Sequence, residues 1–319
     1  MTLRNLITYT LENRLFREIK RKISCKFYRI KLRKIDDLNE RNEKFLILRY
    51  KNSFGVYPNL KNPETFNEKL LWTKLHWRSD LACRCADKIE FKKYLAENDL
   101  EENSAKIIKV YGSSQDFLND LSNLPDNCVI KTNHNSGSVF IKDEKTTPKA
   151  LKRGANFIIE GLNKGCFAKG DEWVYEKIEP KIFVEEKIKS SAPICDYKLF
   201  CFNGEPKYCF VASDRNHLKV KFDYFDMNWN WINVKNVHKH AKNRPQKPEL
   251  LEEMIQICKK LSKPFSHVRV DLYEANGKVY VGELTFFHFG GNERFKPAAF
   301  DKTLGNCWDL TTIKDAEII

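Results

Sequence analysis

Two alternating apolar segments flank the dipeptide Asn276-Gly277, and this pattern constrains the fold more than any other stretch of the chain. The segments cover residues 267–273 and 279–286, and an Asn-Gly pair between them is a strong signal for a β-hairpin. Because residues alternate between the two sides of a strand, Val268 and Val270 share one side. Arg269 and Asp271 fall on the other side, so the hairpin carries one apolar and one charged face.

The length of the hairpin loop decides whether Glu283 joins Asp271. A two-residue loop would pair Asp271 with Gly282 and send Glu283 to the opposite face. A three-residue loop with Gly277 in the left-handed region would place both carboxylates on one face. We expect the odd-length loop, because it gathers the apolar residues on one side.

Two neighbouring carboxylates at Asp271 and Glu283 would repel each other across the strands. A bound cation removes that repulsion, and Mg²⁺ typically takes one or two carboxylates together with substrate phosphates. A solvated hairpin with idle charges is the commoner arrangement for an arbitrary sequence. The remaining motifs favour the metal site.

The composition indicates a globular protein in a reducing compartment. The ten cysteines among 319 residues are scattered and form no C-x-x-C pair. The first residues lack the apolar core and cleavage site of a signal peptide, and no apolar run approaches the length of a membrane span. We therefore expect a cytoplasmic protein.

The basic charge is concentrated at the N-terminus. Residues 1–34 contain eleven Lys or Arg against Glu12 and Glu18, while the net charge of the whole chain is +13. Apolar residues recur there about every fourth position, which predicts a basic amphipathic helix. Such a helix docks on an anionic membrane surface or packs on its own domain, and the sequence weighs both equally. Nucleic-acid binding ranks third, because no nucleic-acid motif accompanies the charge.

Helix and strand patterns are mixed along the chain without regular βαβ alternation, which favours an α+β protein with antiparallel sheets. Thr65 is placed to cap a helix from Phe66 to about Leu75, with Glu68 in the capping-box position. Strand patterns cover Cys128–Thr132, Ile182–Ile188, Tyr197–Phe202, Lys207–Ser213 and Lys219–Phe225.

Three of these strands carry, at one end, residue types that bind nucleotides in other proteins. Lys131 precedes a loop of small polar residues whose N–H groups can turn toward phosphate oxygens, although the loop lacks the Walker A spacing. The strand at Ile182 turns acidic at Glu185 and Glu186, and the next strand opens with Asp196. Each pattern alone is common in plain hairpins and solvent-exposed strands.

Taken in order, these motifs resemble the TupA-like branch of the ATP-grasp superfamily. The resemblance runs from about Tyr57 to Gly305 and leaves out the basic N-terminal helix. It rests on the motifs Asn62-Pro63-x-Thr65-Phe66-Asn67-Glu68-Lys69, Ala86-Asp87-Lys88, Val129-Ile130-Lys131-x-Asn133-His134, Val184-Glu185-Glu186, Asp196-Tyr197-Lys198-x-Phe200-x-Phe202-Asn203-Gly204 and Gly282-Glu283-Leu284-Thr285-Phe286.

The resemblance implies an ATP-grasp fold, in which two α/β subdomains clasp ATP between antiparallel sheets. We expect a basic helical extension over residues 1–50 and an N-terminal α/β subdomain over 51–125. Residues 126–190 would form the subdomain with the phosphate flap and the hinge, and 191–319 the C-terminal subdomain with the metal site.

The resemblance also implies a role for each matching residue. ATP and Mg²⁺ would be the cofactors, and Thr285 stands where many ATP-grasp enzymes have Asn, which leaves a two-metal site open. The implied sets are Lys88 and Lys131 for the phosphates, Asn133, Ser136, Gly137 and Ser138 for the flap, Glu185, Glu186 and Ile188 for adenine, Asp196 for the ribose, Asp271 and Glu283 for Mg²⁺, Lys198 and Arg269 for the transferring phosphoryl group, and Arg294 with Gly290 and Gly291 for the substrate.

The implied activity is that of a carboxylate–amine ligase working through an acyl phosphate. Its substrates would be an amino acid or other amine and the carboxylate of a bacterial surface saccharide or its precursor, from a uronic acid or a glutamyl group. The basic helix would hold the enzyme at the inner face of the cytoplasmic membrane. The alternatives are an ATP-grasp kinase and a non-catalytic nucleotide-binding or polyanion-binding module.

Overall fold

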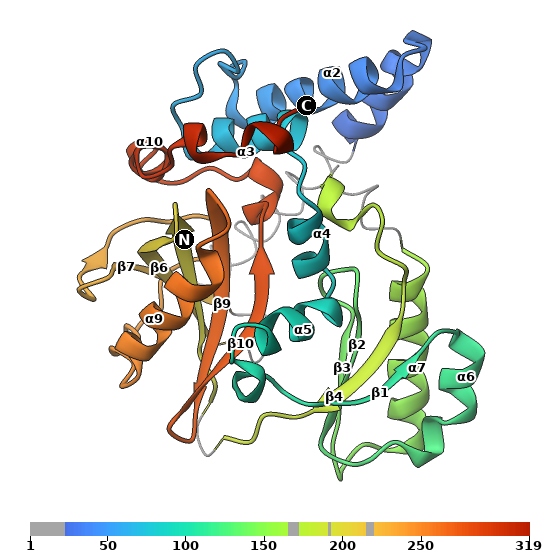
Figure 1. Ribbon diagram of the computed structural model, residues 1–319. Helices are drawn as coiled ribbons and strands as arrows, with labels where there is room; N and C mark the ends of the chain where they lie inside the picture. Colours follow the sequence, from blue (N-terminus) through green and yellow to red (C-terminus); the bar gives the residue numbers. More distant parts are fainter. Residues whose placement is uncertain (1–22, 165–171, 191–192, 215–219) are drawn as a thin grey trace, which may run out of the picture.

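The computed structural model describes residues 23–164, 172–190, 193–214 and 220–319, which form two antiparallel sheets with helices on their outer faces (Figure 1). The smaller sheet has the order β1 (Ile107–Tyr111), β4 (Ile182–Glu186), β2 (Cys128–Thr132) and β3 (Val139–Lys142). The larger sheet has the order β10 (Lys278–Thr285), β9 (His267–Ala275), β5 (Asp196–Phe202), β6 (Glu205–Ser213), β7 (Lys221–Asp226) and β8 (Trp231–Ile232). The expected α+β architecture is confirmed.

The small sheet is covered on one side by α6 (Ser114–Asn119) and α7 (Pro148–Leu162). Strand alternation sends Ile130 and Val184 toward these helices, where they form a separate core with Ile158. The same alternation sends Lys131 and Glu185 to the other side. That side faces the large sheet, so it forms one wall of an inter-sheet cleft.

The large sheet separates apolar and polar residues on its two faces. One face packs on α9 (Leu251–Ser262), where Met254 contacts the core formed with Val270. The opposite face is aromatic at one end, where Phe200 meets Phe66 of α3 (Phe66–His76) edge to face at 5.7 Å. Its other end carries the polar residues of β5, β9 and β10.

The remaining helices join these layers. The helix α2 (Leu38–Phe54) packs on α3, and α10 (Ala299–Asn306) lies beside α3. The helices α4 (Asp80–Ala86) and α5 (Glu90–Ala96) lie between the two sheets. Short 3₁₀ helices are η1 (Leu32–Lys34), η2 (Glu101–Asn103), η3 (Leu121–Asn123), η4 (Trp173–Tyr175), η5 (His288–Gly291), η6 (Leu310–Thr312) and η7 (Asp315–Glu317). None of the helices described is long and apolar enough to cross a membrane.

The predicted capping box of α3 is confirmed, because Thr65 accepts from the Glu68 backbone while Glu68 bonds back to Thr65. The helix α2 continues past residue 50 to Phe54, and β1, which precedes residue 125, pairs with β4 in the small sheet.

The predicted odd-length hairpin loop is wrong. Ala275 pairs with Lys278, so the loop is Asn276-Gly277 alone, with φ of 51° and 72°. Nevertheless, Glu283 pairs with Asp271, because the register shifts by one residue between Val281 and Glu283. Gly282 is the extra residue of a β-bulge, and this bulge places Glu283 on the same face as Asp271 although the loop has only two residues.

The bulge requires a small residue. A Cβ at Gly282 would lie 2.7 Å from the Tyr273 ring, which is too close without a shift of that side chain. Glycine at this position therefore lets Tyr273 pack against the strand while Glu283 turns to the same face as Asp271.

Candidate active site

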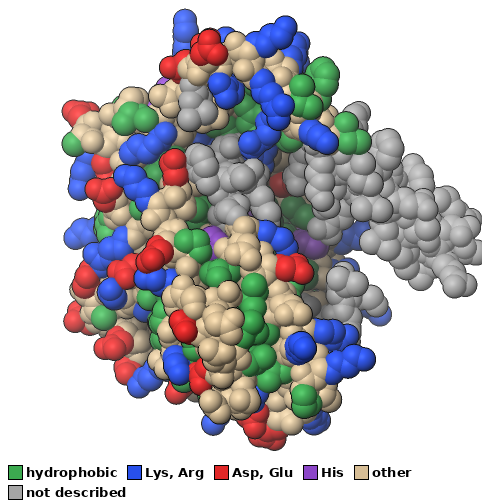
Figure 2. Space-filling model, turned by 90° about the vertical axis from the view of Figure 1, so that its right-hand side faces the viewer, with side chains coloured by type: hydrophobic (Ala, Val, Ile, Leu, Met, Phe, Trp, Pro, Cys, Tyr) green, Lys and Arg blue, Asp and Glu red, His purple; other side chains and the backbone are tan. Residues whose placement is uncertain are grey.

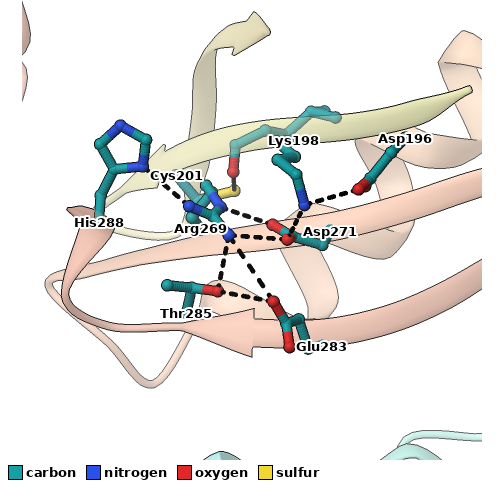
Figure 3. Close-up of polar contacts among 9 residues, drawn as sticks. Asp196, Lys198, Cys201, Arg269, Asp271, Glu283, Thr285 and His288 are labelled. Atoms are coloured by element: carbon teal, nitrogen blue, oxygen red, sulfur yellow. Dashed lines mark hydrogen bonds and ion pairs between the residues drawn. The ribbon is translucent and has the colours of Figure 1, made fainter. Parts of the chain in front are cut away.

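A polar cluster on three adjacent strands of the large sheet surrounds the carboxylate of Asp271 (Figure 3). Arg269 binds it in a bidentate manner, with Nε 2.6 Å from Oδ1 and Nη2 2.7 Å from Oδ2. Lys198 donates to the same Oδ2 and lies 2.9 Å from Oδ2 of Asp196. Arg269 and Lys198 are 7% and 8% exposed, so the cluster is nearly dry.

The cluster stays ionised because its charges compensate each other. Burial alone would raise the pKa of Asp271, yet Arg269 and Lys198 hold that pKa well below its ordinary value. Burial opposes the charge of Arg269, but Asp271 raises the pKa of the guanidinium. The side chains of Arg269 and Lys198 are therefore held by carboxylates at this end of the cleft.

Glu283 is the open member of the cluster. Its side chain is 36% exposed, and its Oε1 lies 3.8 Å from Arg269 Nη2 and accepts a long hydrogen bond of 3.4 Å from Thr285. In the described part of the chain, no group of three or more His, Cys, Asp or Glu could hold a metal ion. The donor set of Asp271 and Glu283 fits Mg²⁺, which completes its shell with water and phosphate oxygens.

His288 belongs to the cluster and was missed in the sequence. Its Nδ1 accepts a hydrogen bond of 2.8 Å from Arg269 Nη1. Burial and the nearby guanidinium hold the pKa of His288 well below its ordinary value, so the ring is neutral and able to accept. Together with Asp271 and Thr285, it fixes the guanidinium on three sides.

A second basic group lines the cleft beside the hairpin. A cavity of about 40 Å³ is bordered by a lysine of α5, by a lysine just before this helix, and by residues of both sheets. Its lining includes Lys88, Lys92, Lys131, Glu185, Ile188, Tyr273 and Gly282. Two predicted phosphate ligands and part of the predicted adenine hinge are therefore brought together.

Glu185 bridges two of these lysines. It hydrogen-bonds Lys131, and its Oε2 lies 3.0 Å from Lys92 Nζ. Burial would raise the pKa of Glu185, but the two ammonium groups lower it. Lys92 of α5 was not among the predicted site residues, although it stands four residues after Lys88, a spacing that places two residues on one face of a helix.

The polar loop after β2 is held down at its base and open at its tip. Asn133 is buried and donates to Asp87 Oδ2 at 2.9 Å, while Lys88 donates to the carbonyl of Asn135 at 2.8 Å. Ser138 packs against α7 at Gly161. Ser136 and Gly137 are exposed, so they form the part of the predicted flap that can meet a ligand.

A larger cavity of about 600 Å³ adjoins the first, and Ser104, Ala105 and Ile188 border both. It is lined by residues 186–189, which include part of the predicted adenine hinge, and by Lys278 and Tyr280 of β10. Ligand pockets commonly measure roughly 300–1,000 Å³, so this cavity has the size of a nucleotide site. Along β10, the order is therefore the larger cavity, the lysines, and then the carboxylates.

Comparison with known proteins identifies the family. No curated protein matches the chain. The family model described as TupA-like ATPgrasp matches residues 68–308, which is more than half of the chain. The chain belongs to the TupA-like ATP-grasp family. Enzymes of the ATP-grasp superfamily bind ATP and Mg²⁺.

Solved structures with similarity to this TupA-like chain include two D-alanine–D-alanine ligases. The ligase of Bacillus anthracis is 21% identical, covers 63% of this chain and 57% of its own, and gives a TM-score of 0.36. The ligase of Helicobacter pylori is 14% identical, and the match covers 76% of this chain and 69% of that ligase with a TM-score of 0.42. A phosphoribosylglycinamide synthetase from Anaerococcus prevotii is 16% identical, with 69% and 48% covered and a TM-score of 0.35.

The proposed substrate residues of this TupA-like protein lie beyond β10. Gly290 and Gly291 are buried in η5 with φ of 63° and 64°, a left-handed backbone that favours glycine. Lys74 donates to the carbonyl of Gly290 at 3.0 Å. Arg294 is exposed, and its Nε donates at 2.6 Å to the carbonyl of Ser53 in the last turn of α2.

Replacing Arg294 with Ala distinguishes a substrate ligand from a helix cap. If its guanidinium binds the substrate carboxylate, we expect the KM for that substrate to rise roughly tenfold, because a charged hydrogen bond is lost. The measurement is steady-state turnover together with thermal unfolding. An unchanged KM with a lowered Tm would mean that Arg294 stabilises the end of α2 and does not bind the substrate. The variant Lys302→Ala, on an exposed surface, serves as the control.

Proposed function

We propose that this protein is an ATP-dependent carboxylate–amine ligase that forms an amide bond through an acyl phosphate. One observation carries the proposal: the hinge cavity, the lysine cleft and the carboxylate pair follow one another along β10. This order matches the adenine, the phosphates and the metal of a bound nucleotide. Family membership supports the same assignment.

The proposed nucleotide contacts divide between the two cavities. Glu185, Glu186 and Ile188 would hold adenine, and Asp196 the ribose. The basic side chains Lys88 and Lys131 would hold the phosphates under the loop tip. In the present arrangement Asp196 is engaged by Lys198, and Glu185 by Lys131, so nucleotide binding exchanges these ion pairs for contacts with the ligand.

Phosphoryl transfer requires neutralisation of developing charge rather than a nucleophilic side chain. Lys198 and Arg269 supply two fixed cations, and Arg269 is held by three partners before any ligand arrives. Asp271 and Glu283 would hold Mg²⁺, which when bound would supply positive charge beside the phosphates. The chain's own contribution is to orient the transferring group and keep it away from water.

We propose that the acceptor carboxylate belongs to a saccharide, as a uronic acid or glutamyl group, and that the amine is an amino acid. The support is the association of TupA-like proteins with the synthesis of bacterial cell-surface polymers. A lipid-linked precursor would place the reaction in the cytoplasm at the inner face of the membrane.

Hydroxylamine trapping tests this proposal directly. Purified protein, ATP and Mg²⁺ are screened with uronic acids, glutamyl peptides and amino acids, while phosphate release is followed. We expect a hydroxamate with the correct carboxylate in the absence of the amine, and amide product with both. A stable phosphorylated product without hydroxamate would indicate a kinase instead, and no turnover with any carboxylate would contradict the ligase assignment.

A further inference from the structure

The described end of the N-terminal helix exposes three large apolar side chains. In the helical residues 23–31, Ile23, Phe27 and Ile30 are 64%, 59% and 52% exposed. Soluble proteins scatter such side chains singly, whereas here they stand within two turns of one helix. Their exposure therefore needs an explanation that the packing among the described residues does not supply.

The opposite face of the same helix already has its partner. Cys25 and Tyr28 pack against a core built from α2 and α3, and Leu32 is buried within it. Arg29 places its guanidinium 4.5 Å above the ring of Phe45, which adds a contact to α2. The helix is thus fixed on the domain, and its outward face has a defined direction.

Helical geometry gives that outward face an ordered pattern of charge. At about 100° per residue, Ile23, Phe27 and Ile30 fall within an arc of roughly 60°. Lys26 lies about 40° beyond one edge of this arc, and Lys31 about 40° beyond the other. All of these side chains are exposed. An apolar strip with a lysine on either side is the pattern of a helix that lies in a lipid interface.

We propose that this face, formed by Ile23, Phe27 and Ile30 with Lys26, Lys31 and Arg33, docks on an anionic membrane surface. The apolar strip would enter the boundary between headgroups and acyl chains, while the cations contact lipid phosphates. Residues 23–34 contain five Lys or Arg and no acidic residue, so the charge is complementary to an anionic bilayer. Figure 2 shows blue and green side chains, with some red ones, at the top of the molecule, where the N-terminal helices lie in Figure 1.

Two other occupants fit this face less well. A second copy would bring the same cations together across a two-fold axis, and like charges in a dry contact repel. A nucleic acid would meet the cations, but it offers no apolar phase to cover two isoleucines and a phenylalanine. A lipid surface satisfies both halves of the pattern.

The docking face is separate from the catalytic cluster. Its inner side contacts α2, and α2 in turn contacts Leu71 of α3 rather than the polar end of the large sheet. The face therefore concerns where the enzyme works, and turnover of a soluble substrate should not depend on it. This separation allows membrane binding to be tested without assuming the ligase reaction.

The test is vesicle co-sedimentation of the full chain. Vesicles of phosphatidylcholine with about 30% phosphatidylglycerol are compared with pure phosphatidylcholine at low and physiological salt. We expect binding to the anionic vesicles alone, with screening by salt. The triple variant Ile23→Ser, Phe27→Ser, Ile30→Ser should lower the partition coefficient on the order of a hundredfold, since three apolar side chains no longer insert.

A control variant on α7 tests whether exposed apolar and cationic side chains at another position have the same effect on vesicle binding. Phe157→Ser with Lys149→Glu and Lys152→Glu changes an exposed apolar residue and two exposed cations on α7. It should bind vesicles as the native chain does. The proposal would be overturned if the triple serine variant bound vesicles as well as the native chain, or if the native chain did not bind them. It would also be overturned if the native chain were a dimer and the triple variant a monomer. Thermal unfolding checks that all variants are folded.

Discussion

Glu283→Gln is expected to reduce turnover by roughly a thousandfold or more while leaving the fold intact. The substitution keeps the size of the side chain but removes one of two charges that would face Mg²⁺. Asp271 alone would leave the ion with one carboxylate, whose charge is already shared with Arg269 and Lys198. The partly exposed position of Glu283 predicts little change in Tm. The measurement is ATP-dependent phosphate release over a range of Mg²⁺ concentrations.

Glu274→Gln provides the matched control for this experiment. Glu274 lies on the same hairpin opposite Val279, on the side of the sheet away from Asp271. Its amide variant should turn over as the native enzyme does. Native turnover in Glu283→Gln would remove the metal assignment, whereas absence of turnover in the native chain as well would leave the protein as a nucleotide-binding or polyanion-binding module without catalysis.

Arg269→Met should lose both activity and stability. Asp271 is 1% exposed, so removing the bidentate guanidinium leaves a buried carboxylate with Lys198 as its remaining cationic partner. Breaking a buried ion pair in this way typically costs about 3–5 kcal/mol of unfolding free energy. Turnover should fall by at least about a hundredfold, because a fixed cation disappears from the transferring group. Urea unfolding and phosphate release measure the two effects.

The double variant Arg269→Met, Asp271→Asn separates these effects. Removing the stranded charge should recover much of the stability but none of the activity. If Arg269→Met were as stable as the native chain, the compensation described for this cluster would be wrong. A recovery of turnover in the double variant would contradict the catalytic role of both residues.

The pH dependence of this cluster follows from the direction of one shift. The pKa of Asp271 is lower in the folded state than the ordinary carboxyl value of about 3.9. A depressed pKa contributes stability that is complete above the unfolded value and is lost as pH falls toward the folded value. The stability deficit of Asp271→Asn should therefore be constant from neutral pH down to about pH 5 and shrink below about pH 4.

Much of the fold was predictable because it depends on local patterns. The strand at Cys128–Thr132 and the capped helix beginning at Phe66 have the predicted bounds or nearly so. These elements are specified by apolar periodicity and by single capping residues, which act over a few positions. Family motifs then identified Lys88 and Lys131, which the structure places in one cleft.

The remaining features depend on contacts between distant segments. His288 meets Arg269 only because η5 packs against α3 and turns the imidazole back to β9. Lys92 joins the lysine cleft because β4 places Glu185 opposite α5, where the two side chains form an ion pair. The pairing of β1 with β4 joins residues about 75 positions apart, and no local pattern in β1 announces that partner. Such pairings follow from the packing of whole layers.

The bulge at Gly282 makes the candidate metal site tolerant of the number of residues between the turn and Glu283. If this glycine were deleted, Glu283 would follow Val281 directly and would pair with Asp271 in a regular ladder, on the same face of the sheet. If Gly282 instead took a regular place opposite Asp271, two-residue periodicity would carry Glu283 to the face that α9 covers. A one-codon insertion can therefore be absorbed by a bulge without separating two carboxylates, provided that the inserted residue stays out of the ladder.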